Sequence, residues 1–373
     1  MTIQELDELR DSAVERIFRD RGAAEKFFLL VSRLWRHSPD NMLVIYMQDD
    51  EAKAVAGKRA FEAQGMRLKD SEKPLFIYNT VIRQSDDGLV VDARTAQAYD
   101  IRQFEELGAG KAADDSNGLR MERSAYLESE TETYEDGRSI DVEARVKELC
   151  GDEGISIMEV DRMPQEAGYY SGFFDEEEQA IIVCRDVKRE LKTSAILYGF
   201  VQFVFSREEL SEDMAEIADK AGRDVREDAE LLALYCVERY LGRRGFVSDP
   251  GLIVENVVRK LLSFEDRRKL ISCVCRGVQD VLRQIEGCPF SVEDTNVVNS
   301  LLISGDRQML LKLYGEIMQS GIRREEKALI ARVFEDILGR MTDKELEALY
   351  DARINRRIYT YPAFKLEECC IKG

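Results

Sequence analysis

Histidine is almost absent from this chain of 373 residues, in which His37 is the only one. A zinc site held by two histidines is therefore excluded, and a Ser-His or Cys-His nucleophile could draw only on that residue. The eight cysteines include no C-x-x-C pair, which argues against a zinc ribbon or a disulfide framework. We interpret the cysteines as buried apolar residues or surface accidents, and we predict no metal and no cofactor.

Long apolar segments are absent too. No stretch approaches the roughly 18 consecutive apolar residues that a membrane span requires, and the first residues are acidic and polar rather than signal-like. We therefore expect a cytoplasmic protein without membrane contact. Hydrophobic residues make up 44% of the chain and charged residues 34%, which is enough apolar material for packed cores. The length predicts two or three domains.

Negative charge is concentrated in the middle of the chain, whose formal net charge is −19. Residues 1–83 carry no net charge and residues 251–373 carry +1, whereas residues 84–150 carry −9 and residues 151–250 carry −11. Such a middle repels phosphate backbones, while the neutral N-terminal segment can still present a local basic face.

Apolar spacing indicates an α+β protein that is predominantly helical. Residues 3–19, 23–36 and 188–205 have helical periodicity, residues 74–82 are typical of a strand, and residues 168–184 are typical of a hairpin. The domains we expect are a small α/β N-terminal domain at 1–83, an acidic, partly mobile connector at 84–138, an α+β domain at 139–250 and a helical bundle at 251–373.

An ordered series of polar, glycine and lysine positions follows the second predicted helix. Its members are Asn41, Gln48, Gly57, Gly65, Lys69, Glu72 and Lys73. This series resembles the ArdC/LtrC-like proteins of plasmids and conjugative elements, with Phe61 where Trp is usual and Ser71 where Gly is usual. The resemblance implies an N-terminal domain that binds single-stranded DNA, joined to a zinc metallopeptidase-like domain.

The second part of the resemblance covers residues 168–238. Where the family carries H-E-x-x-H on a helix, two histidines one turn apart hold zinc and the glutamate activates water. The aligned positions here are Ile196, Leu197 and Phe200, which are all apolar, and the family's third ligand aligns with Glu230. The resemblance therefore implies a zincin-like fold without its metal or its base, which we interpret as a pseudoenzyme.

Each candidate residue also has a purely structural interpretation. Trp35 and Arg36 either clamp a single strand by stacking or anchor a helix as a half-buried ring and a solvated neighbour. Asn41 and Gln48 share one helix face and either contact bases or bond neighbouring loops. Glu230 is either a vestigial ligand or a hydrogen-bonded or exposed carboxylate. Five basic residues within 16 positions either follow phosphates or form a solvated face: Lys58, Arg59, Arg67, Lys69 and Lys73.

These features favour a non-catalytic accessory protein of a mobile genetic element that binds single-stranded DNA through residues 1–83, with the antirestriction role that the resemblance implies. One alternative is a scaffold that recruits a protein partner through the pseudoenzyme domain and the helical bundle, which predicts an exposed apolar patch. Another is an acidic decoy that mimics DNA, which predicts carboxylates of residues 84–250 along one continuous surface.

Overall fold

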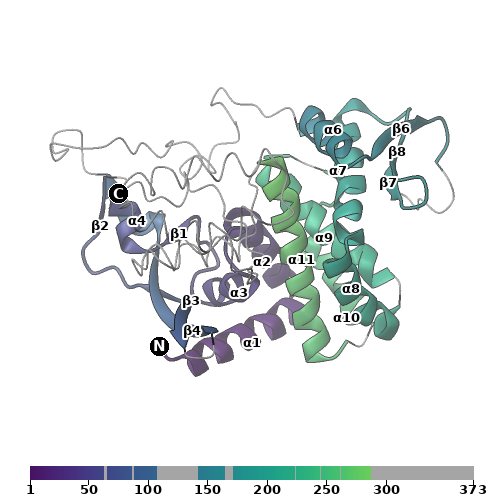
Figure 1. The fold of residues 1–373 in the computed structure, drawn as a ribbon. Coiled ribbons are helices and arrows are strands. Elements are labelled where there is room, and N and C mark those ends of the chain that lie inside the picture. Colours follow the sequence, from purple (N-terminus) through teal and green to yellow (C-terminus); the bar gives the residue numbers. More distant parts are fainter. Residues whose placement is uncertain are drawn as a thin grey trace. The chain divides into compact units, whose positions relative to one another are not determined.

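The computed structural model describes residues 1–62, 65–85, 88–106, 142–163, 171–222, 224–243, 245–260 and 262–286. The chain divides into two compact units. Among the described residues, the first unit comprises residues 1–3 and 55–106, and the second comprises residues 4–54 and 142–286. Helices predominate in this part of the chain, and small sheets accompany them (Figure 1), which confirms the predicted α+β class.

The first unit is built mainly from strands. Its elements are β1 (Val55–Ala56), α4 (Lys58–Glu62), β2 (Met66–Leu68), β3 (Leu75–Ser85), β4 (Gly88–Asp100), the 3-10 turn η1 (Ile101–Gln103) and β5 (Phe104–Glu106). One antiparallel sheet has the order β1-β4-β3, and β2 pairs with β5. The rings of Phe61 and Phe104, 4.6 Å apart between centroids, form the centre of a small core.

The long hairpin of β3 and β4 crosses the boundary that the sequence suggested at residue 83. Its register runs from Leu75 opposite Ala98 to Ser85 opposite Gly88. Residues 88–106 therefore continue the first unit as strands, because antiparallel pairing satisfies the backbone groups of both segments. The rest of the expected connector, residues 107–138, lies outside the described residues.

The second unit is mostly helical. In chain order it contains α1 (Ile3–Arg19), α2 (Arg21–Leu34), α3 (Pro39–Gln48), α6 (Val142–Asp152), β6 (Ser156–Val160), β7 (Gly172–Asp175), β8 (Ala180–Cys184), α7 (Arg189–Ser206), α8 (Glu208–Ala221), α9 (Asp224–Tyr240), α10 (Pro250–Val258) and α11 (Phe264–Ile285). The central strand β8 is parallel to β6 and antiparallel to β7. Side-chain oxygens cap the first turns of four helices: Asp20, Ser38, Asp249 and Ser263.

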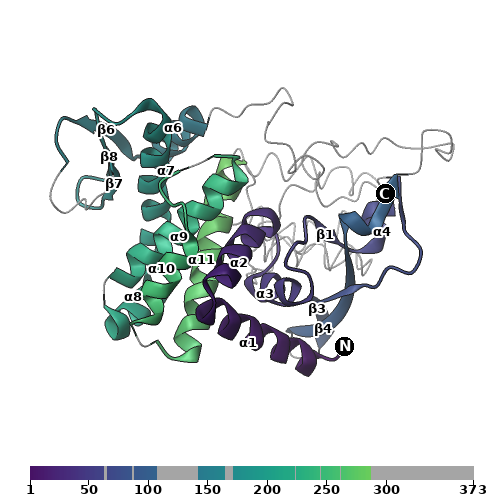
Figure 2. The same cartoon turned by 180° about the vertical axis from the view of Figure 1, so that it is seen from behind.

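Helix α9 is the centre of the second unit (Figures 1 and 2). Nearly its whole circumference is buried, because it packs against α2, α7, α10 and α11. The contact with α2 is direct: the rings of Trp35 and Tyr240 meet edge-on at 6.0 Å, and the Cys236 thiol donates to the Phe28 carbonyl. The helices before residue 54 thus pack with the later helices, although the sequence grouped them with residues 55–83.

The helices α10 and α11 also join this unit instead of starting a separate bundle at residue 251. An amphipathic helix must cover its apolar face, and it does so against whichever element is near in space. Residues 287–373 of the expected bundle lie outside the described residues. Among the described helices, none is long and apolar enough to cross a membrane.

Gly277 lies on the face of α11 that packs against α7. A β-carbon there would lie 2.2 Å from Cε2 of Phe205, so Gly277→Ala should overpack the contact. We expect the free energy of unfolding to fall by about 1–3 kcal/mol, although alanine is the better helix former. Urea unfolding followed by circular dichroism measures the change.

Gly151→Ala in α6 is the matched control, since nothing lies within 4 Å of a β-carbon at that position. This change should leave stability unchanged or raise it by about 0.4–1 kcal/mol, because alanine restricts the unfolded chain. Equal destabilisation by the two substitutions would contradict the packing interpretation.

Candidate functional site

Glu230 of α9 is the buried centre of a polar network that joins three elements, and it is 4% exposed. Gln202 of α7 donates from Nε2 to Oε2 of Glu230 at 3.2 Å. Its Oε1 accepts the backbone N–H of Phe174 in β7 at 2.9 Å. Both bonds require the same amide orientation, because the backbone group can only donate and the carboxylate can only accept. Gln202 therefore links the edge strand of the sheet to α9.

Arg226 satisfies the other oxygen of Glu230 from one turn earlier on α9. Its Nε donates to Oε1 of Glu230 at 2.9 Å, and its Nη2 lies 3.3 Å from the carboxylate of Glu176 in the turn between β7 and β8. Both oxygens of the buried carboxylate thus accept hydrogen bonds from side chains. The network meets the general requirement that a buried polar group be paired.

Burial raises the pKa of Glu230 to about 7, while the Arg226 charge and the hydrogen bond from Gln202 act in the opposite direction. Two turns further along α9, Glu238 is also buried, and burial raises its pKa despite Ser194 of α7 and nearby Arg243. The face of α9 toward α7 therefore carries two buried carboxyl groups.

The α7 residue that bonds Glu230 is not one of the positions that the resemblance aligns with H-E-x-x-H. Ile196, Leu197 and Phe200 are each 0% exposed and belong to the apolar core. The residue bonded to Glu230 is Gln202, two positions after Phe200. The side chains of the three aligned positions therefore fill the core, and the α7 side chain that bonds Glu230 is a different one.

Gln202 could have been found from the sequence, whereas its charged neighbours could not. It is the one amide in the apolar run between Ala195 and Phe205, and an amide buried in such a helix needs a polar partner. Arg226 and Glu176 carry no comparable signal, because charged residues on a helix or in a turn are ordinarily solvated.

The groups around Glu230 do not fit the metal that the resemblance implies. The amide nitrogen of Gln202 and the guanidinium of Arg226 are hydrogen-bond donors, and neither offers a lone pair to a metal. No group of three or more His, Cys, Asp or Glu side chains able to hold a metal ion occurs among the described residues. The arrangement instead fixes three elements by hydrogen bonds.

Four predicted DNA contacts lie in or against the core of the second unit. Trp35 is 3% exposed, and the Arg36 guanidinium lies 4.7 Å from its ring centroid. Asn41 is buried in the first turn of α3, where its N–H bonds the Ser38 cap, and Gln48 donates to a backbone carbonyl one turn earlier. These contacts match the structural interpretation, since a base would need the ring face that Arg36 covers.

The five basic residues predicted to follow phosphates all belong to the first unit and are all exposed: Lys58, Arg59, Arg67, Lys69 and Lys73. Arg67 bonds Glu105 across the β2–β5 pair at 2.9 Å, and this bond raises the pKa of Arg67. Lys58 pairs with Glu62 at 3.4 Å, and Lys69 donates to a backbone carbonyl at 2.6 Å. The exposed cations are thus interleaved with carboxylates.

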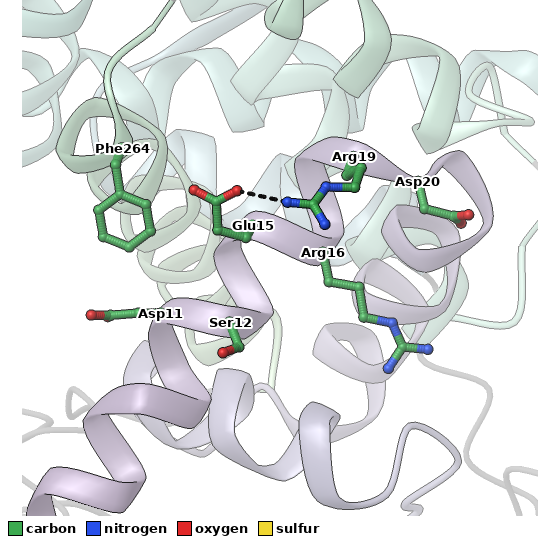
Figure 3. Close-up of a pocket in the computed structure, with 7 residues that line it drawn as sticks. All are labelled: Asp11, Ser12, Glu15, Arg16, Arg19, Asp20 and Phe264. Atoms are coloured by element: carbon green, nitrogen blue, oxygen red, sulfur yellow. Dashed lines mark hydrogen bonds and ion pairs between the residues drawn. The ribbon is translucent and has the colours of Figure 1, made fainter.

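A pocket of about 440 Å³ lies beside α1 in the second unit (Figure 3). Glu15 and Arg19, which pair at 3.4 Å, form part of its wall. Three carboxylates, two guanidinium groups, a hydroxyl and one ring line it: Asp11, Ser12, Glu15, Arg16, Arg19, Asp20 and Phe264. Because these side chains carry charges of both signs, they define no single class of ligand. The sequence did not single out these residues.

No family model and no curated protein matches the sequence. Two solved structures have a similar fold: the metal-free and the Mn(II)-bound crystal structures of the antirestriction protein ArdC from plasmid R388. The metal-free structure has a TM-score of 0.45 and 9% identity, over 75% of this chain and 98% of that chain. The Mn(II)-bound structure has a TM-score of 0.39 and 8% identity, over 70% and 96%. These values describe a distant likeness of fold.

The stability of the chain should depend on pH through Glu230. A glutamate in the unfolded chain has a pKa of about 4.3, whereas the pKa of Glu230 in the folded chain is about 7. Between these values the folded chain holds a proton that the unfolded chain has released, so stability is lost as the pH rises through the folded pKa. We expect the free energy of unfolding to fall by about 1.4 kcal/mol between about pH 6 and about pH 8.5.

Glu230→Gln removes the titrating group but keeps an oxygen that can accept from Arg226. Urea unfolding of both proteins over the same pH series isolates the contribution of Glu230, because all other groups titrate in both. The substituted protein should lose the Glu230 component of the slope. Identical slopes would show that the carboxyl group keeps its ordinary pKa.

Proposed function

We propose that this chain is a non-catalytic accessory protein that binds single-stranded DNA through exposed basic side chains of its first unit. The proposal that the chain is non-catalytic is supported by Glu230, whose two carboxylate oxygens both accept hydrogen bonds from side chains. A hydrolytic zinc centre needs lone-pair ligands and a base beside the metal. Here both oxygens of Glu230 accept N–H groups from Gln202 and Arg226, which supports a binding role over a hydrolytic one.

Exposed cations of the first unit support a nucleic-acid ligand. Arg59 and Lys73 are exposed, and Lys58 and Lys69 keep their ammonium groups at the surface. An extended phosphate chain binds such cations through counterion release, without regard to sequence. Arg67 contributes less because Glu105 already neutralises it. Residues 55–106 contain eight basic and nine acidic residues, a net charge of −1, which permits this local attraction in an otherwise acidic chain.

The biological role that we propose is protection of single-stranded DNA of a mobile genetic element against restriction. The series of positions from Asn41 to Lys73, which resembles ArdC/LtrC-like proteins, supports this role. A sequence-independent cationic surface suits it, because transferred DNA has no fixed sequence.

The described carboxylates of the second unit give little support to an acidic decoy. Several of those within residues 84–250 are paired with cations at 2.7–2.9 Å: Glu153 with Arg207, Asp213 with Lys269, and Asp228 with Lys260. A decoy needs carboxylates that remain unpaired along one surface. A scaffold needs a contiguous apolar patch, whereas the described second unit exposes only three large apolar residues: Leu29, Met158 and Leu252.

Binding should be measured with a fluorescent single strand of about 30 nucleotides by anisotropy over a salt series. Arg59→Gln with Lys73→Gln should weaken binding and reduce the slope of log affinity against log salt by about 1.4, if each side chain meets one phosphate. Lys147→Gln with Arg185→Gln, on the second unit, removes the same charge and should leave the slope unchanged.

Two results would contradict the nucleic-acid part of the proposal. The unsubstituted protein could fail to bind the strand at low salt. Alternatively, the two pairs of substitutions could weaken binding equally, which would mean that only the total charge matters and that the first unit holds no specific cationic surface.

The non-catalytic part is tested with purified protein, casein and added zinc. We expect no hydrolysis above background, because the buried carboxylate faces hydrogen-bond donors instead of metal ligands. Casein cleavage that requires zinc and stops on chelation would overturn this part. Glu230→Gln should then abolish the cleavage if the same centre is responsible.

A further inference from the structure

Helices α7 and α9 pack antiparallel, with polar pairs at two levels of their contact. Gln202 bonds Glu230 at one level, and Ser194 lies beside Glu238 at the other. The members of each helix are eight residues apart, which is a little over two turns. Ser194, Tyr198 and Gln202 therefore share one face of α7, and that face is turned toward α9.

Gln202 faces Glu230, and Tyr198 lies one turn before it on the same face of α7, which is the spacing at which a helix presents two metal ligands. Side chains at i and i+4 lie one above the other on a helix, and one carboxylate from a facing helix completes a three-ligand site. Tyr198 is 2% exposed and one turn from Gln202. Ile196 and Phe200 also lie four residues apart, but they are on the opposite face of α7 from Ser194, Tyr198 and Gln202.

We infer that the Gln202 amide and the Arg226 guanidinium together replace a divalent metal ion at the contact between α7 and α9. A metal ion at Glu230 would neutralise the carboxylate and tie the two helices together. Here the Arg226 guanidinium supplies the positive charge, with its Nε 2.9 Å from Oε1 of Glu230. The Gln202 amide links the two helices, with its Nε2 3.2 Å from Oε2 of Glu230. The second bond of the amide, to Phe174, fastens β7 to the same point.

Gly199, which follows Tyr198 on α7, packs closely against the sheet. A β-carbon on Gly199 would lie 2.5 Å from Cγ2 of Ile181 in β8. A glutamate at this position would have to displace the buried Ile181 side chain, which disfavours a carboxylate base there. Metal binding, and not activity, is therefore the proper readout. The inference rests on the non-catalytic part of the proposed function and is independent of DNA binding.

The test rebuilds the site in the full-length chain. Tyr198→His with Gln202→His, combined with Arg226→Met, offers two imidazoles to Glu230. Ile196→His with Phe200→His in the same Arg226→Met background is the matched control. Isothermal titration with zinc, and visible absorption with cobalt(II), measure binding of the metal alone. We expect one ion per chain in the rebuilt protein, with an affinity about 100-fold above that of the unsubstituted chain and of the control.

Adding Glu230→Gln to the rebuilt protein should lower its metal affinity by about tenfold or more, because the third ligand is lost. A rebuilt protein that is folded by circular dichroism but binds metal no better than the control would overturn the inference. Metal binding that is indifferent to Glu230→Gln would overturn it as well.

The natural network provides a second measurement if the rebuilt protein does not fold. Gln202→Met and Glu230→Gln, alone and together, form a double-mutant cycle read as urea midpoints. The double substitution should lower the midpoint by less than the sum of the single ones, whereas Gln202→Met with Glu216→Gln in α8 should be additive. Additivity of the first pair would show that Gln202 does not stabilise the carboxylate and would overturn the inference. Zinc-dependent casein cleavage by the natural chain would overturn the non-catalytic part of the proposed function and the inference with it, whereas failure of the metal-binding test alone would leave the proposed function unchanged.

Discussion

The burial of the Glu230 carboxylate away from water constrains which side chains can surround it at the centre of the second unit. Glu230 lies in the most enclosed helix of that unit, where an unpaired charge would be strongly destabilising. Its two oxygens require donors from fixed directions, and Gln202 and Arg226 supply them. Because Gln202 also holds the Phe174 N–H, the spacing of α7, α9 and β7 is set by one chain of hydrogen bonds.

An apolar core surrounds this network at the positions where the metallopeptidase resemblance would place its catalytic motif. Ile196, Leu197 and Phe200 are fully buried, and each stabilises the fold by about 1.5–3 kcal/mol relative to exposure. Close packing leaves no room to change one position alone, as Gly199 against Ile181 and Gly277 against Phe205 illustrate. Within this packing, the polar network around Glu230 joins α7, α9 and β7.

The two units differ in the charged groups that they could offer to a phosphate chain. Many carboxylates of the second unit form ion pairs, as Asp213 and Asp228 do, so part of its negative charge is neutralised by its own cations. Its aromatic rings are covered by guanidinium groups, as Trp35 is by Arg36. The first unit instead keeps exposed cations on α4 and next to β2. A phosphate chain would therefore meet its best surface on the first unit.

The sequence by itself determined the secondary structure of much of the chain and the lack of a histidine site. The helical periodicity of residues 3–19 and 188–205, the Ser38-Pro39 helix start and the strand after Pro74 all follow from local rules that act over one or two turns. The single histidine likewise excluded a two-histidine zinc centre without any coordinates. Only the tertiary structure decided that α2 packs on α9, that Trp35 is buried and that Gln202 meets Glu230. Those contacts join residues far apart in the chain, and long-range packing leaves no local signature in the order of the amino acids beyond the demand that apolar faces and buried polar groups find partners.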